Sequence, residues 1–176
     1  MTSEQAKTLE ALQIAIKMEI DGKEFYLQAA AGSRNETGKK LLQSLAEEED
    51  VHRHKLEAIY KAVSANKTWP ATSFEPDRGI KLSILFAGTC QATGANVDGI
   101  ATEFDALNIA IEKEKESYDF YECQAQTATY EVERDFYEKV AAEERGHELI
   151  LVDYSEYLTD PAGWFVKTEH PSLDGG

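Results

Sequence analysis

Apolar residues recur at spacings of three and four along four long stretches of the chain, which cover about residues 4–31, 35–63, 102–127 and 130–158. This spacing places the apolar side chains on one face of an α-helix and predicts four amphipathic helices. The second stretch keeps the pattern without a break, although two mid-helix members are polar; its members are Leu42, Leu45, Glu49, His52, Leu56, Ile59 and Val63.

The two halves of the chain repeat each other at an offset of 95 residues. Residues 11–26 and 106–121 are identical at eight of sixteen positions. The repeat predicts that the first helix pair and the second pair are two copies of one hairpin. The same offset relates three polar residues of the first half to three of the second, and the matched pairs are Glu19 with Glu114, Glu49 with Glu144, and His52 with His147.

A long connection, residues 65–101, separates the two predicted hairpins and contains two prolines and four glycines. Within it, residues 80–87 could form a short helix or a strand. A connection of this length runs from one end of a bundle to the other, and it favours an all-α, ferritin-like four-helix bundle over a simple up-and-down bundle. The step Asp160-Pro161 predicts that the fourth helix stops there and that residues 159–176 form a short tail.

The composition, with 42% apolar and 29% charged residues in 176, is that of one globular domain spanning residues 1–176. The formal net charge of −15 disfavours nucleic acid and anionic membranes as partners. No apolar run is long enough to cross a membrane and the N-terminus does not resemble a signal peptide, so we expect a cytoplasmic protein. Cys90 and Cys123 are too few for a disulfide framework, and we expect free thiols that are buried or partly buried.

The polar residues on the apolar helix faces predict a metal site. Residues three apart share one side of a helix, so both residues of each Glu-x-x-His pair point toward the bundle axis. Burying four carboxylates and two imidazoles without partners would be very costly, whereas two divalent cations would balance the four negative charges. Such mixed donors suit iron or manganese and also accept zinc. An acidic face turned to solvent is the alternative. The six predicted ligands are Glu19, Glu49, His52, Glu114, Glu144 and His147.

Four neighbours of the predicted ligands also match across the repeat. Tyr26 and Tyr121 lie two helical turns after the lone glutamates, where a phenol could hydrogen-bond a ligand carboxylate or relay an electron, or simply pack in the core. Gly22 and Ser117 lie one turn after the same glutamates. Their small side chains would leave room beside the metals for O₂ or peroxide, or would allow close helix packing.

Glu48 and Glu143 directly precede the glutamates of the two Glu-x-x-His pairs and match across the repeat as well. One residue corresponds to about 100° around a helix, so both side chains point away from the predicted ligand face. We expect them to form ion pairs at the surface.

These motifs resemble the rubrerythrin branch of the ferritin-like superfamily. The resemblance implies a non-haem di-iron protein in which the six residues hold two iron ions. Rubrerythrins proper also carry a rubredoxin domain with two Cys-x-x-Cys pairs, which this chain lacks. Peroxide-reducing members have a further glutamate where this chain has Ser117. The matching segments lie on all four predicted helices and run from Glu19 to Tyr26, Leu45 to His52, Glu114 to Tyr121 and Ala142 to His147.

The resemblance implies an oxidoreductase of rubrerythrin type that reduces peroxide or O₂ with electrons from an external donor such as a rubredoxin, in a response to oxidative stress. Tyr26 and Tyr121 are then candidate catalytic residues beside the metals. A ferroxidase or a ferritin-like iron-handling protein would use the same six ligands and remains the main alternative. A redox-inert structural ion and oxygenation of an organic substrate are two others. The resemblance also implies a homodimer, with or without exchange of helices through the long connection.

Overall fold

The computed structural model describes residues 3–65, 68–70, 74–93 and 100–169. The predicted all-α fold is confirmed, and the described residues contain no strand. The four long predicted helices are present with ends within a few residues of those expected. The helices are α1 Ser3–Gly32, α2 Glu36–Ser64, α3 Ile80–Thr93, α4 Ile100–Thr127, α5 Glu131–Thr159 and α6 Pro161–Glu169.

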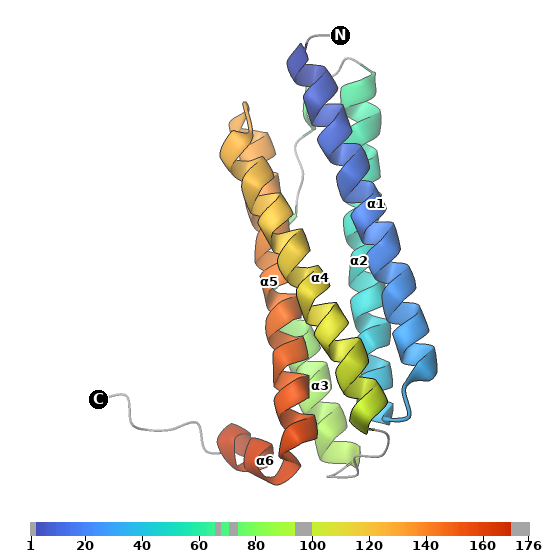
Figure 1. Cartoon of the computed structure of the whole chain (residues 1–176). Helices are drawn as coiled ribbons and strands as arrows, with labels where there is room; N and C mark the ends of the chain where they lie inside the picture. The colour runs from blue at the N-terminus through green and yellow to red at the C-terminus, as the bar shows by residue number, and fades with distance from the viewer. Residues whose placement is uncertain (1–2, 66–67, 71–73, 94–99, 170–176) are drawn as a thin grey trace, which may run out of the picture.

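Two antiparallel helical hairpins form the body of the structure (Figure 1). Helix α1 packs along α2, and α4 packs along α5, whereas the contacts between the two hairpins are sparser. Helix α3 packs against both α2 and α5 and so closes one side of the bundle. The long connection therefore carries the chain from the end of α2 to the opposite end of the bundle, as predicted.

The turn between α1 and α2 is tied to the second hairpin by a chain of hydrogen bonds. Asn35 caps α2, because its side chain accepts a hydrogen bond from the backbone N–H of Gly38 at 3.1 Å. The Arg34 backbone N–H donates to one oxygen of buried Glu103 at 3.1 Å, and the Tyr154 hydroxyl donates to the other at 3.1 Å. A Cβ at Gly38 would overlap the Tyr154 hydroxyl, so a glycine is required where α5 crosses α2.

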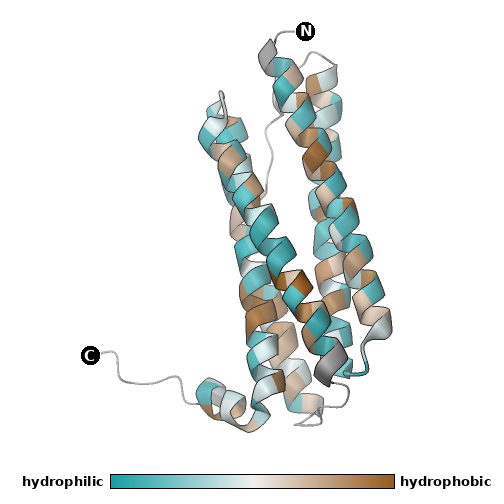
Figure 2. Ribbon diagram, in the orientation of Figure 1, coloured by the Kyte–Doolittle hydropathy of each residue, from teal (hydrophilic) through white to brown (hydrophobic). Residues whose placement is uncertain are grey.

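The apolar core divides into two clusters at opposite ends of the bundle, and charged residues are buried between them. In Figure 2 hydrophilic and hydrophobic residues alternate along each long helix, as expected for helices with one packed face. Within the described residues, no helix is both long and apolar enough to cross a membrane. The fully buried aromatic residues of the two clusters are Tyr26, Phe86, Tyr154 and Tyr157 in one, and Tyr121, Phe136 and Tyr137 in the other.

The structure decides between the two alternatives for one segment and changes the expectation for another. Residues 80–87 belong to a helix, α3, which continues to Thr93. The expected tail is helical in its first part, because Asp160 accepts a hydrogen bond from the Gly163 backbone N–H at 3.0 Å and Pro161 occupies the first position of α6. Proline is well tolerated at that position, so the same dipeptide that ends α5 also starts α6.

The two cysteines lie in different environments. Cys90 is fully buried in the core cluster that contains Phe86 and Tyr157, as predicted. Burial raises the pKa of its thiol to about 12. Cys123 is exposed on α4, so the prediction of a buried or partly buried thiol is wrong there. Its position on the helix faces away from both core clusters.

Candidate metal centre

The six residues predicted as ligands meet in the middle of the bundle, between the two apolar clusters. They come from all four long helices, and no more than 5% of the surface of any of them is exposed. Helix α1 supplies one, α2 two, α4 one and α5 two, which reproduces the order expected from the repeat. These residues are Glu19, Glu49, His52, Glu114, Glu144 and His147.

Their ligating atoms form two overlapping groups. Within each group, one nitrogen or carboxylate oxygen per residue lies within 4.8 Å of the corresponding atoms of the others. Glu49 and Glu144 belong to both groups, whereas the lone glutamates and the histidines belong to one group each. One group is Glu19, Glu49, His52 and Glu144, and the other is Glu49, Glu114, Glu144 and His147.

Both imidazoles turn the Nδ1 atom toward the carboxylates. Nδ1 of His52 lies 3.2 Å from a Glu144 oxygen and 3.5 Å from a Glu19 oxygen. Nδ1 of His147 lies 3.4 Å from a Glu49 oxygen and 3.5 Å from a Glu114 oxygen. The two rings stack with their centroids 5.7 Å apart. Each histidine therefore presents one nitrogen to one of the two groups.

Every one of the six side chains has a buried polar atom without a hydrogen-bond partner among the described residues. An unsatisfied buried polar atom costs about 1–3 kcal/mol, and more when it is charged. The orphaned atoms are four carboxylate oxygens and two imidazole nitrogens, which is the donor set that iron or manganese accepts. The residues present therefore fit a pair of divalent cations. The atoms are Oε2 of Glu19, Oε1 of Glu49, Nδ1 of His52, Oε2 of Glu114, Oε1 of Glu144 and Nδ1 of His147.

When no cation is bound, several of the clustered side chains are protonated, which stabilises the cluster. Burial, reinforced by neighbouring carboxylates, raises the pKa of Glu49 well above its usual range, and burial and the charge of Glu144 raise the pKa of Glu114 to about 8. Burial alone would lower the pKa of His52, but the carboxylates that it faces raise it to about 10. Burial would also lower the pKa of His147, but the carboxylates around it raise the pKa above its usual range. Burial would raise the pKa of Glu144, but the two imidazoles lower it.

Tyr26 and Tyr121 are both buried and hydrogen-bond to the cluster. The Tyr26 hydroxyl on α1 donates to Glu114 on α4, and the Tyr121 hydroxyl on α4 donates to Glu19 on α1. The sequence placed each phenol on the face of the glutamate in its own helix, whereas the structure pairs each with the glutamate of the other hairpin. The two bonds therefore also fasten one hairpin to the other.

Glu48 and Glu143 differ from the prediction of surface ion pairs. Glu48 accepts a hydrogen bond from Nε2 of His147 at 3.0 Å, which leaves Nδ1 of that ring to face the cluster. Glu143 is 4% exposed and accepts the backbone N–H of Asp77 in the long connection. Glu143 is covered because the long connection crosses this side of the bundle, whereas the side chain of Glu48 remains 25% exposed. Their match across the repeat was the signal in the sequence that could have identified them.

The long connection packs over the side of the centre formed by α2 and α5. A Cβ on Gly146 of α5 would lie 2.4 Å from the carbonyl carbon of Arg78, so the two backbones are in direct contact. Phe74 packs edge-on against His52 with ring centroids 5.9 Å apart, and the Lys55 ammonium lies 3.6 Å above the Phe74 ring. On this side, described residues of the long connection lie directly against the two helices that carry the histidines.

The opposite side, between α1 and α4, contains a pocket of about 180 Å³ that reaches two of the clustered carboxylates. Gly22 and Ser117 line it, as the sequence suggested, and a Cβ on Gly22 would lie 3.2 Å from a Glu49 oxygen. The pocket is lined by residues from both halves of the repeat, namely Met18, Asp21, Gly22, Tyr26, Glu49, Lys113, Glu114, Glu116 and Ser117.

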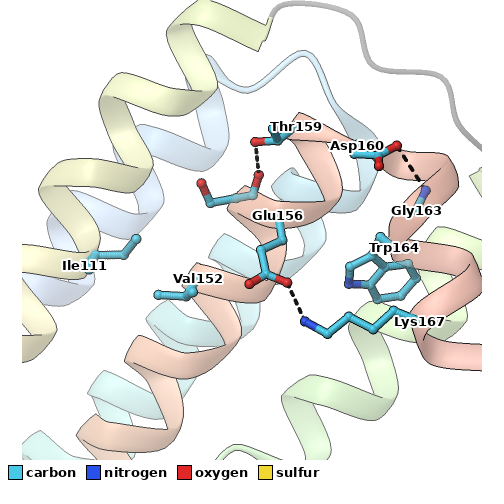
Figure 3. Close-up of a pocket in the computed structure, with 9 residues that line it drawn as sticks. Ile111, Val152, Glu156, Thr159, Asp160, Gly163, Trp164 and Lys167 are labelled. Atoms are coloured by element: carbon cyan, nitrogen blue, oxygen red, sulfur yellow. Dashed lines mark hydrogen bonds and ion pairs between the residues drawn. The ribbon is translucent and has the colours of Figure 1, made fainter. Parts of the chain in front are cut away.

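A larger hollow lies at the junction of α4, α5 and α6 (Figure 3). Its lining includes the ion pair between Lys167 and Glu156 at 2.7 Å and the edge of Trp164. None of the six clustered residues lines it. We therefore place the candidate site at the buried cluster and the pocket beside it.

Comparison with known proteins agrees with the geometry of the cluster. No curated protein and no solved structure gives a significant match to the chain. The sequence model of the rubrerythrin family matches residues 10–155, a range that contains all six clustered residues and both tyrosines. This match covers most of the chain, and the chain belongs to the rubrerythrin family.

Proposed function

We propose that the protein is a non-haem di-iron oxidoreductase that reduces peroxide or O₂ with electrons from an external donor. The observation that carries the proposal is the buried cluster in which each of six side chains directs an unsatisfied polar atom toward the others. Two iron ions bound there would supply two electrons to the oxidant and would be reduced again by the donor.

In this proposal Glu19 and His52 would hold one iron ion, and Glu114 and His147 would hold the other. Glu49 and Glu144, which are common to the two groups of ligating atoms, would contribute to both sites. Four carboxylates balance the charge of two divalent ions, so the loaded cluster carries no net charge. In the structure all six come from one chain, so a homodimer would not need to exchange helices to complete the site.

The neighbouring residues position the ligands and control access. The phenols of Tyr26 and Tyr121 fix one oxygen of each lone glutamate, and Glu48 holds the imidazole of His147 with Nδ1 inward. The pocket between α1 and α4 is small and lined mainly by polar residues, which suits a two-oxygen molecule better than an organic substrate. On the α2–α5 side the long connection packs against the helices that carry the histidines, with Phe74 against His52.

A ferroxidase or iron-handling protein is the second candidate. Asp21 and Glu116 at the same pocket would attract Fe²⁺, and the formal net charge of −15 would increase its local concentration. In that case Fe²⁺ is itself the reductant and no donor protein is needed. Turnover supported by a rubredoxin favours the first candidate, and oxidation and retention of Fe²⁺ beyond two ions per chain favours the second.

The test starts from purified protein loaded anaerobically with Fe²⁺ and then given hydrogen peroxide. We expect about two bound ions per chain and a near-ultraviolet absorption band of oxidised iron after peroxide. Glu49→Ala should abolish both, whereas Glu47→Ala, which removes an exposed glutamate two residues earlier, should change neither. Fewer than one ion per chain, or a tightly held zinc that iron cannot replace, would contradict the proposal.

A further inference from the structure

We propose that Tyr121 donates an electron to the metal centre when the centre is one electron short. Tyr137 and Trp69 then carry a replacement electron from the surface to Tyr121. The inference rests on the proposed function, since it needs an oxidant at the centre. It assigns unequal roles to two tyrosines that the sequence repeat makes equivalent.

Three aromatic rings connect the centre with the edge of the bundle. The Tyr121 hydroxyl donates to Glu19, and its ring stacks on Tyr137 with centroids 6.1 Å apart. Tyr137 meets the ring of Trp69 edge-on, with centroids 5.6 Å apart. Trp69 lies in the long connection next to exposed Thr68, and 9% of its surface is exposed. The rings thus form a continuous series from the ligand carboxylate to Trp69, which is buried except for 9% of its surface.

The other half of the repeat has no such path. The Tyr26 hydroxyl donates a hydrogen bond to Glu114, just as the Tyr121 hydroxyl donates to Glu19. The residue that corresponds to Tyr137 at the offset of 95, however, is Leu42. Among the described residues, the ring contact of Tyr26 is with Phe25, which precedes it in the chain. A leucine cannot mediate electron transfer as an aromatic ring does, so Tyr26 serves as a matched control.

The hydrogen bonds decide which ring loses an electron. The Tyr121 phenol faces a carboxylate that can take its proton as the electron leaves. The Tyr137 hydroxyl and Nε1 of Trp69 are buried without hydrogen-bond partners among the described residues. Tyr137 has no base to accept its proton, so its ring acts as a bridge between Tyr121 and Trp69. An indole can lose an electron without losing a proton, which suits the surface end.

The electrons balance as follows. Reduction of hydrogen peroxide to two waters takes two electrons and two protons. A centre that holds one reducing equivalent supplies the first electron, and Tyr121 supplies the second. Both protons come from solvent, while the phenolic proton of Tyr121 passes to Glu19. The resulting tyrosyl radical regains its electron through Tyr137 and Trp69 from a one-electron reductant in solution, such as ascorbate, and recovers its proton.

The experiment uses full-length protein loaded with two iron ions and poised at one reducing equivalent per chain. Hydrogen peroxide is added, the sample is frozen within milliseconds, and the radical is measured by electron paramagnetic resonance. We expect a tyrosyl signal that is lost in Tyr121→Phe and kept in Tyr26→Phe. Iron content and the band of oxidised iron are measured in each variant, so that loss of the radical is not confused with loss of metal.

The second readout is the decay of the radical after ascorbate is added. We expect decay to be slower in Tyr137→Leu and in Trp69→Leu, and unchanged in Tyr137→Phe, because a phenylalanine ring still bridges. Equal decay in wild type and Tyr137→Leu, or a signal lost in Tyr26→Phe and kept in Tyr121→Phe, would overturn the inference. Absence of the oxidised-iron band would contradict the proposed function, whereas that band without any radical would contradict the relay alone.

Discussion

Metal binding at the cluster is expected to release protons, and this links affinity to pH. Metal ligands must be deprotonated, yet the carboxylates around His52 raise its pKa to about 10, and burial raises that of Glu114 to about 8. At pH 7, removing the His52 proton costs about 4 kcal/mol, three pKa units, and removing the Glu114 proton costs about 1 kcal/mol. The metal must supply this free energy when it binds.

The expected magnitude follows from the number of protons displaced. With two protons released, the overall constant for binding two ions should rise by about a hundredfold between pH 6 and pH 7. Isothermal titration calorimetry with Mn²⁺, in buffers with different ionisation enthalpies, counts the protons directly. We expect at least two protons per two ions at pH 7 in the wild type, about one fewer in Glu114→Gln, and no change in Glu47→Gln.

The metal-free protein should lose stability over the same pH range. Both groups have raised pKa values in the folded state, so the folded protein holds protons that the unfolded chain releases. The contribution of Glu114 is complete below pH 4.5 and is lost as pH rises to about 8, and that of His52 is complete below pH 6.5 and is lost as pH rises to about 10. The lowered pKa of Glu144 acts in the opposite sense under acid conditions.

Chemical denaturation of metal-free protein at pH 6, 7.5 and 9 measures this loss. The metal-loaded protein should be much less sensitive, because its ligands are already deprotonated. If metal binding released no protons and the metal-free protein were equally stable at pH 6 and pH 9, the cluster would not be protonated in the way described.

Three further predictions concern the surroundings of the centre. Glu48→Gln, which weakens the hold on the Nε2 proton of His147, should reduce metal affinity by about 10- to 100-fold in a chelator competition, with Glu47→Gln unchanged. Gly146→Ala should lower the free energy of unfolding by about 1–3 kcal/mol in urea denaturation, because the added Cβ would collide with the backbone of the long connection. The control Gly88→Ala should raise the free energy of unfolding by about 0.5–1 kcal/mol, because a Cβ there has nothing within 4 Å. Tyr154→Phe should cost about 1–3 kcal/mol in the same assay, since buried Glu103 loses the hydroxyl donor; an unchanged midpoint would exclude a role for that bond.

The repeat makes the two halves of the centre similar, but their surroundings are not. His147 has the carboxylate of Glu48 on its outer nitrogen, whereas Glu143, which matches Glu48 across the repeat and lies close to it, accepts a backbone N–H of the long connection. The difference arises because the long connection occurs once per chain and donates its hydrogen bond to Glu143. A twofold pattern in the sequence thus produces a centre whose two ends have different neighbours.

The sequence by itself determined the long helices and which residues turn inward. Helical periodicity is local, so a spacing of three between Glu49 and His52 fixes their common face wherever the helix packs. The offset of 95 then predicted that a second such pair meets the first. These inferences need no knowledge of the loops, and the structure places all six polar residues in one buried cluster.

Only the tertiary structure decided what lies beside that face. Residues at the flank of a helix, such as Glu48 and Glu143, are exposed or buried according to which other segments pack over them. Here the long connection buries Glu143, whereas Glu48 stays partly exposed beside His147. The hydroxyl partners of Tyr26 and Tyr121 likewise depend on how the hairpins face each other, because a phenol reaches across to a neighbouring helix. Local spacing fixes a direction on a helix, whereas the contact found in that direction depends on packing between segments distant in the sequence.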